Sequence, residues 1–172
     1  MKNSAVTSLV LALALLGAGC FGPRMYSSEE LQTMSDDEKK AAMEEMLKDY
    51  PAPEFTKEEQ VSEQKEMIEV MANGTPERMA DFEPRNLHSV TGKARIVKKE
   101  DRYQIVLSED FTVTPGPYLV VRVGGKEIGK LQSTKGAQVY DLPSDFSLTQ
   151  ATDVNIFCKP FQVVFAIATF GN

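Results

Sequence analysis

The chain has 172 residues, with 19 Lys and Arg against 25 Asp and Glu, so its formal net charge at pH 7 is −6. This length suits one compact domain with appendages, and the negative charge argues against nucleic-acid binding, which needs a basic face to displace counterions. Two cysteines are too few for a disulfide framework, and one histidine excludes any site that needs two imidazoles from this chain.

Residues 1–19 have the layout of a secretory signal peptide. Lys2 provides a short positive start, residues 5–16 form an apolar run, and small residues occupy positions 17–19. The run is too short for a membrane-spanning helix, which needs roughly 20 apolar residues. We therefore expect this segment to direct export and to be removed.

The apolar run leads to Cys20 through Ala18 and Gly19, and this sequence resembles the lipobox of bacterial lipoproteins. The resemblance implies that Cys20 is acylated and becomes the first residue, so that the protein is anchored to the membrane of the cell envelope. Phe21 follows where an inner-membrane retention signal would have Asp, which favours the outer membrane or the periplasmic face. An ordinary cleaved signal that happens to contain a cysteine is the alternative.

Residues 20–87 are expected to form an acidic helical spacer, since residues 21–87 hold 8 basic and 17 acidic side chains. Capping boxes at Ser35 and Thr56 predict helices over 36–49 and 57–72, and a further short helical turn is expected over 75–79. The helices have narrow apolar stripes, so docking on the β domain, docking on a partner, and a loose stalk all remain open. Repulsion between the carboxylates and anionic headgroups favours the stalk.

Methionines recur at helical spacing within this spacer, at Met43 and Met46 and at Met67 and Met71. Such pairs have the softness of Cu(I) ligands, but methionine at this spacing is more often a flexible filler of apolar gaps. No histidine or third methionine converges on them in the sequence. We therefore predict no metal site.

Residues 88–172 alternate apolar and polar side chains in short runs separated by turn residues. This pattern predicts a mainly β fold, an antiparallel β-sandwich of about eight strands that follows the helical spacer. The expected strands are 89–97, 103–107, 111–114, 118–123, 128–132, 138–142, 154–158 and 162–169.

Glycine, proline and apolar landmarks recur in a characteristic order through residues 88–170. They are His88 and Gly92, Phe111 with Gly116-Pro117, Ile128-Gly129-Lys130-Leu131, Gly136-Ala137-Gln138-Val139-Tyr140 with Leu142-Pro143, and Ile156-Phe157-Cys158 before Phe161. In this order they resemble the DM13 domain, a family described as an electron-transfer module. The resemblance implies a β-sandwich in which Cys158 is the proposed redox centre, either as a bare thiol or through a bound prosthetic group. Phe157, where the family often has Trp, and Ala166, where it often has Gly, depart from the pattern.

Three roles remain open for Cys158. Strand alternation places it with Val154 and Ile156 on the core-directed face, where a thiol has a raised pKa and is inert. Its position at the end of the strand, before Lys159, would instead leave it reachable by a redox partner. An intermolecular disulfide is the third possibility, because unpaired cysteines are unusual outside the cytoplasm.

The candidate redox chemistry is limited by the residues available, and no cofactor is identified. Blue copper needs two histidines, covalent haem lacks its motif, and iron–sulfur clusters lack thiolates. Haem held by Cys158 or His88 has no support in the sequence, and His88 is more readily a hydrogen-bonded structural residue. Thiol–disulfide exchange needs only one exposed thiolate.

Two functions therefore compete for this chain. One is an envelope lipoprotein with a redox or electron-transfer role through Cys158, working with another envelope protein. The other is a non-enzymatic binding or scaffolding β-sandwich in which Cys158 is buried. A hydrolase is disfavoured, because Ser89 lies in no Gly-x-Ser-x-Gly motif and has no identifiable acid partner.

Overall fold

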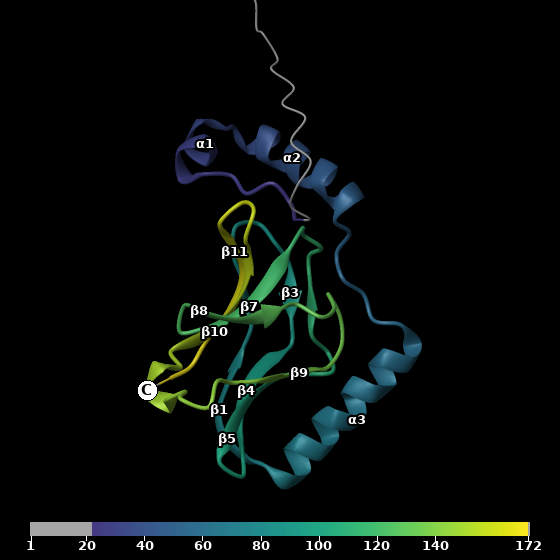
Figure 1. Cartoon of the computed structure of the whole chain (residues 1–172), viewed down its shortest axis with the longest axis vertical. Coiled ribbons are helices and arrows are strands. Elements are labelled where there is room, and N and C mark those ends of the chain that lie inside the picture. Colours follow the sequence, from purple (N-terminus) through teal and green to yellow (C-terminus); the bar gives the residue numbers. More distant parts are fainter. Residues whose placement is uncertain (1–21, 172) are drawn as a thin grey trace, which may run out of the picture.

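The computed structural model describes residues 22–171, so the expected signal peptide and Cys20 lie outside the described part of the chain. Two packed β-sheets form the body, with two helices at one end and a third along one side (Figure 1). Within residues 22–171 no helix is both long enough and apolar enough to cross a bilayer. The helices are α1 (Ser28–Thr33), α2 (Asp36–Asp49), α3 (Lys57–Asn73) and a 3₁₀ turn (Leu148–Gln150), and the strands are β1 (Thr75–Asp81), β2 (Glu83–Pro84), β3 (Val90–Thr91), β4 (Lys93–Lys99), β5 (Arg102–Leu107), β6 (Thr112–Val113), β7 (Leu119–Val123), β8 (Lys126–Lys130), β9 (Gln138–Asp141), β10 (Asp153–Cys158) and β11 (Val163–Thr169).

The sheets have the orders β1-β4-β5-β9 and β2-β11-β10-β7-β8, and every pair of neighbouring strands is antiparallel. A short β3-β6 ladder adds a third pairing. The prediction of a mainly β, antiparallel sandwich is therefore confirmed. Its core lies between the two inner faces, and its largest fully buried members include Ile96, Ile105, Phe111, Leu119, Ile156 and Phe165.

The sandwich begins before residue 88, and the helical turn expected over 75–79 is wrong. Those residues belong to β1, which pairs with β4 from Thr75 opposite Lys98 to Asp81 opposite Lys93. Thr75-Pro76 is a plausible helix start in isolation, but the ladder with β4 satisfies more backbone groups than one helical turn does. Pro76 is tolerated because β1 is an edge strand with a bulge beside it.

Gly92 divides the strand expected over 89–97 into β3 and β4. Its backbone is left-handed, with φ of +95°, and a Cβ placed there would lie 2.7 Å from the Phe111 Cα atom. A side chain at this position would therefore meet both backbone strain and a steric clash. The glycine lets the chain turn tightly over the 108–111 turn.

The predicted capping boxes are confirmed at both helices. Ser35 Oγ accepts from the Glu38 N–H while the Ser35 N–H donates to the Glu38 carboxylate, and Thr56 and Glu59 repeat the arrangement. Helix α2 spans the expected residues, and α3 extends one residue further, to Asn73. Helix α1 was not predicted, although Ser27 forms a box of the same kind.

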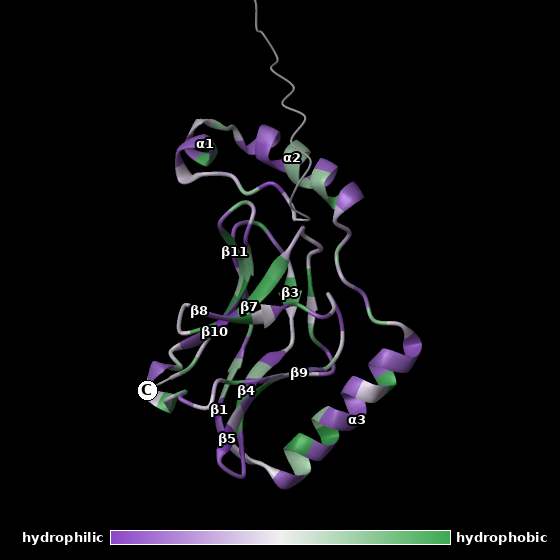
Figure 2. Cartoon of the chain, in the orientation of Figure 1, coloured by the Kyte–Doolittle hydropathy of each residue, from purple (hydrophilic) through white to green (hydrophobic). Residues whose placement is uncertain are grey.

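Helix α3 packs on the outer face of the four-stranded sheet, so the expectation of a loose stalk is wrong for this helix. Val70, only 1% exposed, contacts a second apolar cluster made with Val97 and Val106, and Met67 and Met71 fill the space around it. Apolar and hydrophilic residues are mixed along α3 (Figure 2), and the apolar Val61 and Ile68 are exposed to solvent. The outer face of the sheet is consequently buried around Val97 and Val106, and these methionines act as packing residues.

The same helix also reaches the edge strand β9. One carboxylate oxygen of Glu63 accepts a hydrogen bond from the Val139 N–H at 3.3 Å. Burial raises the pKa of this carboxyl group above its ordinary value. Helix α3 is therefore attached to β9 by a hydrogen bond as well as by apolar packing.

Helices α1 and α2 lie at the end of the sandwich near the loop that joins β10 to β11 (Figure 1). The Tyr26 N–H donates to the Pro160 carbonyl at 3.0 Å, and the Gln162 side-chain amide donates to the Tyr26 carbonyl at 2.8 Å. The Tyr26 ring packs on Phe161, and Met46 of α2 is buried against the core. The spacer is therefore docked at both of its ends.

Candidate functional site

Cys158 is the last residue of β10, between Val163 of β11 and Leu119 of β7. Its side chain is 0% exposed and belongs to the main core, together with Val154 and Ile156. The alternation predicted for this strand is therefore confirmed. Of the roles left open for Cys158, burial in the core is the one that the structure shows, and the alternative of a thiol reachable at the strand end is wrong for this conformation.

Two features of the chain seal this end of β10. The Cys158 Sγ atom donates to the Pro117 carbonyl oxygen at 3.2 Å, so the segment before β7 closes over it. The loop after Cys158 is in turn covered by the N-terminal segment, since the rings of Tyr26 and Phe161 have centroids 5.0 Å apart. Sequence alternation alone gave no information about this cover, because it comes from distant parts of the chain: Pro117 lies 41 positions before Cys158, and Tyr26 lies still further away.

The surroundings of Cys158 disfavour the thiolate, which is the reactive form of its side chain. Burial raises the pKa of the thiol to about 12, although a backbone hydrogen bond from Phe161 partly opposes the rise. Relative to the ordinary value of 9.0, this leaves about a thousand-fold less thiolate at neutral pH. The thiolate is the nucleophile in thiol–disulfide exchange, so the folded protein presents very little of the reactive form.

His88 packs against an aromatic ring. Its imidazole stacks on Phe165 with the ring centroids 3.5 Å apart and 13° between the planes. Burial lowers the pKa of His88 below its ordinary value, which keeps the ring neutral at neutral pH. Within residues 22–171 no hydrogen bond links His88 to Cys158, so the structure does not join these two candidates into one site.

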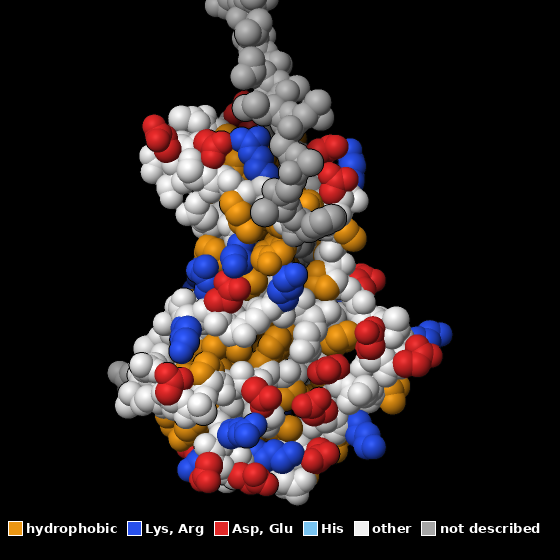
Figure 3. All heavy atoms as spheres, in the orientation of Figure 1, with side chains coloured by type: hydrophobic (Ala, Val, Ile, Leu, Met, Phe, Trp, Pro, Cys, Tyr) orange, Lys and Arg blue, Asp and Glu red, His pale blue; other side chains and the backbone are white. Residues whose placement is uncertain are grey.

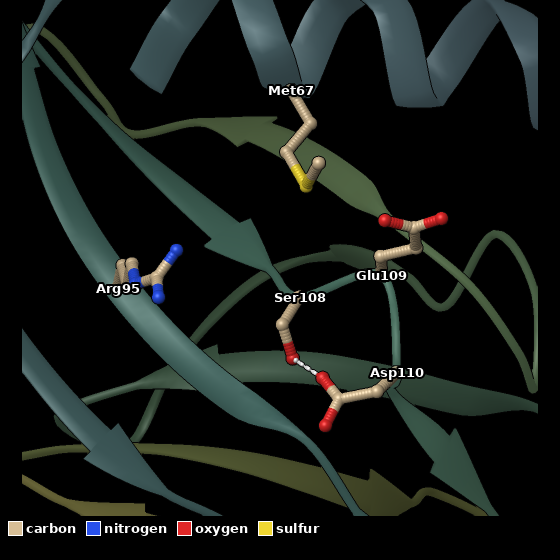
Figure 4. A pocket seen from close by; sticks show the side chains of 5 residues that line it. All are labelled: Met67, Arg95, Ser108, Glu109 and Asp110. Atoms are coloured by element: carbon tan, nitrogen blue, oxygen red, sulfur yellow. Dashed lines mark hydrogen bonds between the residues drawn. The ribbon is translucent and has the colours of Figure 1, made fainter. Parts of the chain in front are cut away.

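A surface pocket of about 410 Å³ lies between α3 and the turn that follows β5 (Figure 4). Ser108 Oγ donates to the Asp110 carboxylate at 2.6 Å and accepts from the Lys93 N–H at 2.7 Å. These bonds hold the turn, as does the Phe111 N–H, which donates to the Ser108 carbonyl. No histidine lines the pocket, so Ser108 has no base to activate it.

The outer face of the five-stranded sheet carries cations stacked on aromatic rings, which sequence reasoning missed. The Arg122 guanidinium carbon lies 3.4 Å from the ring centroid of Phe157. The ammonium nitrogens of Lys130 and Lys159 lie 4.7 and 5.5 Å from the ring centroid of Tyr118. Strand alternation on β7 and β10 would have placed Arg122 and Phe157 on one face, but only the register makes them neighbours.

Two polar atoms on this face are buried without a hydrogen-bond partner among the described residues. They are the Arg122 Nε and the Asn155 Oδ1, on residues that lie opposite each other in the ladder. The Asn155 amide nitrogen does donate to the Asp153 carboxylate, at 2.7 Å. The unpaired Arg122 Nε is a donor and the unpaired Asn155 Oδ1 is an acceptor, and the two residues are paired across the strands. One water molecule can bridge a donor and an acceptor in this arrangement.

The described part of the chain contains no cluster of side chains that could bind a metal ion. Residues 22–171 contain no group of three His, Cys, Asp or Glu side chains arranged to hold an ion. Cys20, the expected lipidation site, lies outside the described residues.

Comparison with known proteins identifies part of the β domain. The family model described as "DM13: Electron transfer DM13" matches residues 122–170, a segment that includes Phe157 and Cys158. The chain therefore carries a DM13 match over the second part of its sandwich, as the resemblance predicted, while residues 88–121 lie outside the match. Neither a curated protein nor a solved structure matches the chain.

Proposed function

We propose that this chain is a lipid-anchored protein of the cell envelope whose β-sandwich is a non-enzymatic binding or scaffolding module. The observation that carries the proposal is the burial of Cys158. Its sulfur is 0% exposed and donates to the Pro117 carbonyl, and burial raises the pKa of the thiol to about 12. A side chain in this state contributes apolar packing to the core.

The anchor is the second part of this proposal. It is supported by the apolar run ending at Cys20, which resembles the lipobox and directly precedes the docked residues. Acyl chains contribute about 0.8 kcal/mol per buried CH₂, so several chains on one cysteine hold a protein firmly. The partner of the sandwich is then another protein of the same compartment.

Thiol labelling of residues 21–172 tests the function. Cys158 is the only cysteine of this segment, so a maleimide reports on it alone. We expect it to react only on denaturation, whereas Val61→Cys in a Cys158→Ala background reacts at once, because position 61 is 66% exposed. Fast labelling of the folded wild-type chain at neutral pH would overturn the proposal.

A redox role is the second candidate, and the DM13 match over residues 122–170 is what favours it. In this version the Cys158 thiolate attacks a disulfide of a partner, a mixed disulfide forms, and the partner's other sulfur leaves as a thiolate. Because the sulfur is sealed, the step requires local opening at the end of β10. Trapping of a mixed disulfide by native protein, lost in Cys158→Ala, would favour this candidate.

Fractionation tests the anchor separately. We expect Cys20→Ser to release the protein from membranes into the soluble fraction, with the folded domain unchanged by circular dichroism. Retention of this variant in the membrane fraction would contradict the lipid anchor without bearing on the role of Cys158.

A further inference from the structure

Charges of opposite sign line the surface pocket between α3 and the turn that follows β5. Figure 4 shows Arg95 of β4 on one side of this pocket and Glu109 and Asp110 on the other. The volume of about 410 Å³ lies in the range of sites for small molecules, roughly 300–1,000 Å³. Within residues 22–171 no ion pair involves any of these three side chains. One cation and two carboxylates therefore share a pocket without direct contact between them.

Arg95 is held on its side of the pocket by a neighbouring strand. It lies opposite Met79 of β1 and Val106 of β5, on the outer face of the four-stranded sheet. The Arg95 Nε donates to the Met79 Sδ atom, a neutral acceptor, at 3.2 Å. Its two terminal nitrogens make no hydrogen bond with the described residues, so the edge of the guanidinium that binds a carboxylate through two parallel bonds is free.

The two carboxylates are held on the opposite side in the same manner. Glu109 accepts from the side-chain amide of Gln64 on α3 at 2.7 Å, and Asp110 accepts from the Ser108 Oγ at 2.6 Å. Each of these bonds uses one carboxylate oxygen, and the second oxygen has no hydrogen-bond partner in the described part of the chain. Lys93, whose N–H donates to Ser108, has its ammonium group paired with a carboxylate of β1. Two carboxylate oxygens are thus left to bind a cation from outside.

The wall between the two charged sides is apolar. The Met67 side chain extends from α3 toward the space between them and is half-buried (Figure 4). A thioether is polarizable and adapts its shape to apolar groups. On the face drawn in Figure 3, acidic and basic side chains lie close together without a large patch of one sign. The local order of charges in the pocket, cation, apolar wall and carboxylates, therefore determines which ligand it suits.

We propose that this pocket binds a small zwitterion, a molecule with a carboxylate and an ammonium group at the two ends of a short apolar chain. The ligand carboxylate accepts hydrogen bonds from the terminal nitrogens of Arg95, the ammonium group donates to Asp110 and Glu109, and the apolar chain lies against Met67. A simple cation would face the guanidinium and a simple anion would face two carboxylates, so the pocket selects against both. This inference goes beyond the proposed function, and it depends neither on the lipid anchor nor on the state of Cys158.

An NMR titration of residues 21–172, which contain the whole described fold, tests the charge pattern. The probes are γ-aminobutyrate, δ-aminovalerate and ε-aminocaproate, and the controls are the amine and the carboxylate of the same carbon count, which carry one charge each. We expect saturable shifts of the backbone amides at Arg95 and at residues 108–110. At least one zwitterion should bind at least about threefold more tightly than both of its controls. Equal affinity for the amine, or no saturable shift at these residues with any zwitterion, would overturn the proposal.

The cationic side of the pocket is tested by Arg95→Gln. This variant should weaken binding of the best zwitterion by at least about threefold, without weakening binding of the matching amine. Arg102→Gln is the matched control, because it changes the net charge equally at the first residue of β5, away from the turn that follows this strand. Equal weakening by the two variants would show that overall charge decides binding, and would overturn recognition by Arg95.

The acidic side is tested by Asp110→Asn combined with Glu109→Gln. Both replacements keep an acceptor oxygen for Ser108 and for Gln64 while they remove the charge, so the turn stays hydrogen-bonded. We expect weaker binding of the zwitterion and no weakening of the matching carboxylate, with circular dichroism unchanged. If the double variant does not fold, Glu109→Gln alone is measured in the same way. Wild-type affinity for the zwitterion in the folded variant would overturn the proposal.

Discussion

The rings of Tyr26 and Phe161 pack with their centroids 5.0 Å apart, although 135 positions separate them in the sequence. Tyr26 belongs to the segment that follows the expected lipid anchor, and Phe161 belongs to the loop that follows Cys158. This contact makes the N-terminal segment a part of the cover over the candidate redox residue. The environment of Cys158 thus depends on residues outside the β-sandwich itself.

Truncation of Tyr26 should therefore loosen that cover. We expect Tyr26→Ala to lower the free energy of unfolding by about 1–3 kcal/mol and to accelerate maleimide labelling of Cys158. Tyr103→Ala is the control, because Tyr103 packs on Phe146 elsewhere, at a centroid distance of 5.8 Å. Urea unfolding and labelling rates measure both effects. If the two variants are equally destabilised and label equally fast, Tyr26 has no specific role at Cys158.

The raised pKa of Cys158 predicts a loss of stability at alkaline pH. The unfolded thiol releases its proton near pH 9, whereas the folded protein keeps it until about pH 12. The folded state therefore binds more protons in this window. The stabilisation that the buried thiol provides is complete below pH 9 and is lost as pH rises toward 12. Over this range the free energy of unfolding falls by up to about 1.4 kcal/mol per pH unit. Urea unfolding at pH 8–10.5 should give a steeper decline in wild type than in Cys158→Ala, and identical slopes would contradict a protonated, buried thiol.

His88 predicts the opposite behaviour at acidic pH. Burial lowers its pKa in the folded state, so below pH 6.5 the unfolded chain binds the proton more readily. The contribution of the neutral His88 ring to the free energy of unfolding is complete above pH 6.5. It is lost as the pH falls below 6.5 through the lower pKa of the folded state. His88→Phe should keep the stack on Phe165 and reduce the difference in unfolding free energy between pH 7.5 and 5.5. Because the chain has one histidine, its imidazole NMR signal reports the titration directly, and a midpoint at or above 6.5 would contradict this prediction.

The docking of α3 can be measured through one buried valine. Val70→Ala removes two methyl groups from the cluster between α3 and the sheet, and we expect it to cost about 1–3 kcal/mol. Val61→Ala, on the exposed side of the same helix, should change stability by less than about 0.5 kcal/mol. Chemical denaturation of both variants distinguishes a docked helix from a free one. Similar small losses in both would mean that α3 is not held by this cluster.

The sequence predicted the parts of the fold that depend on local signals. The capping boxes at Ser35 and Thr56 located two helices, because an N-terminal cap is formed by residues only three positions apart. Alternation on β10 correctly placed Cys158 with Val154 and Ile156. The β1 strand was missed, because Thr75-Pro76 reads locally as a helix start and its strand conformation depends on pairing with β4.

The exposure of Cys158 was not predictable for the same reason. Periodicity gives the face of a strand on which a residue lies, but not what covers the end of that strand. Here the cover comes from Pro117 and from the N-terminal segment through Tyr26. The stack of Arg122 on Phe157 likewise required the register between β7 and β10, which single-strand patterns do not specify.

The bond from Glu63 to β9 also limits how this molecule can associate with others. An edge strand with free N–H and C=O groups is a template for strand addition from another chain, in growth of aggregates as well as in peptide capture. At β9 the carboxylate occupies the Val139 N–H, and α3 lies beside the edge. At the outer edge of the other sheet, β8 presents Lys126, Glu127 and Lys130, charges that discourage sheet-to-sheet polymerisation. The β9 and β8 edges are therefore poor templates for strand addition from a neighbouring molecule.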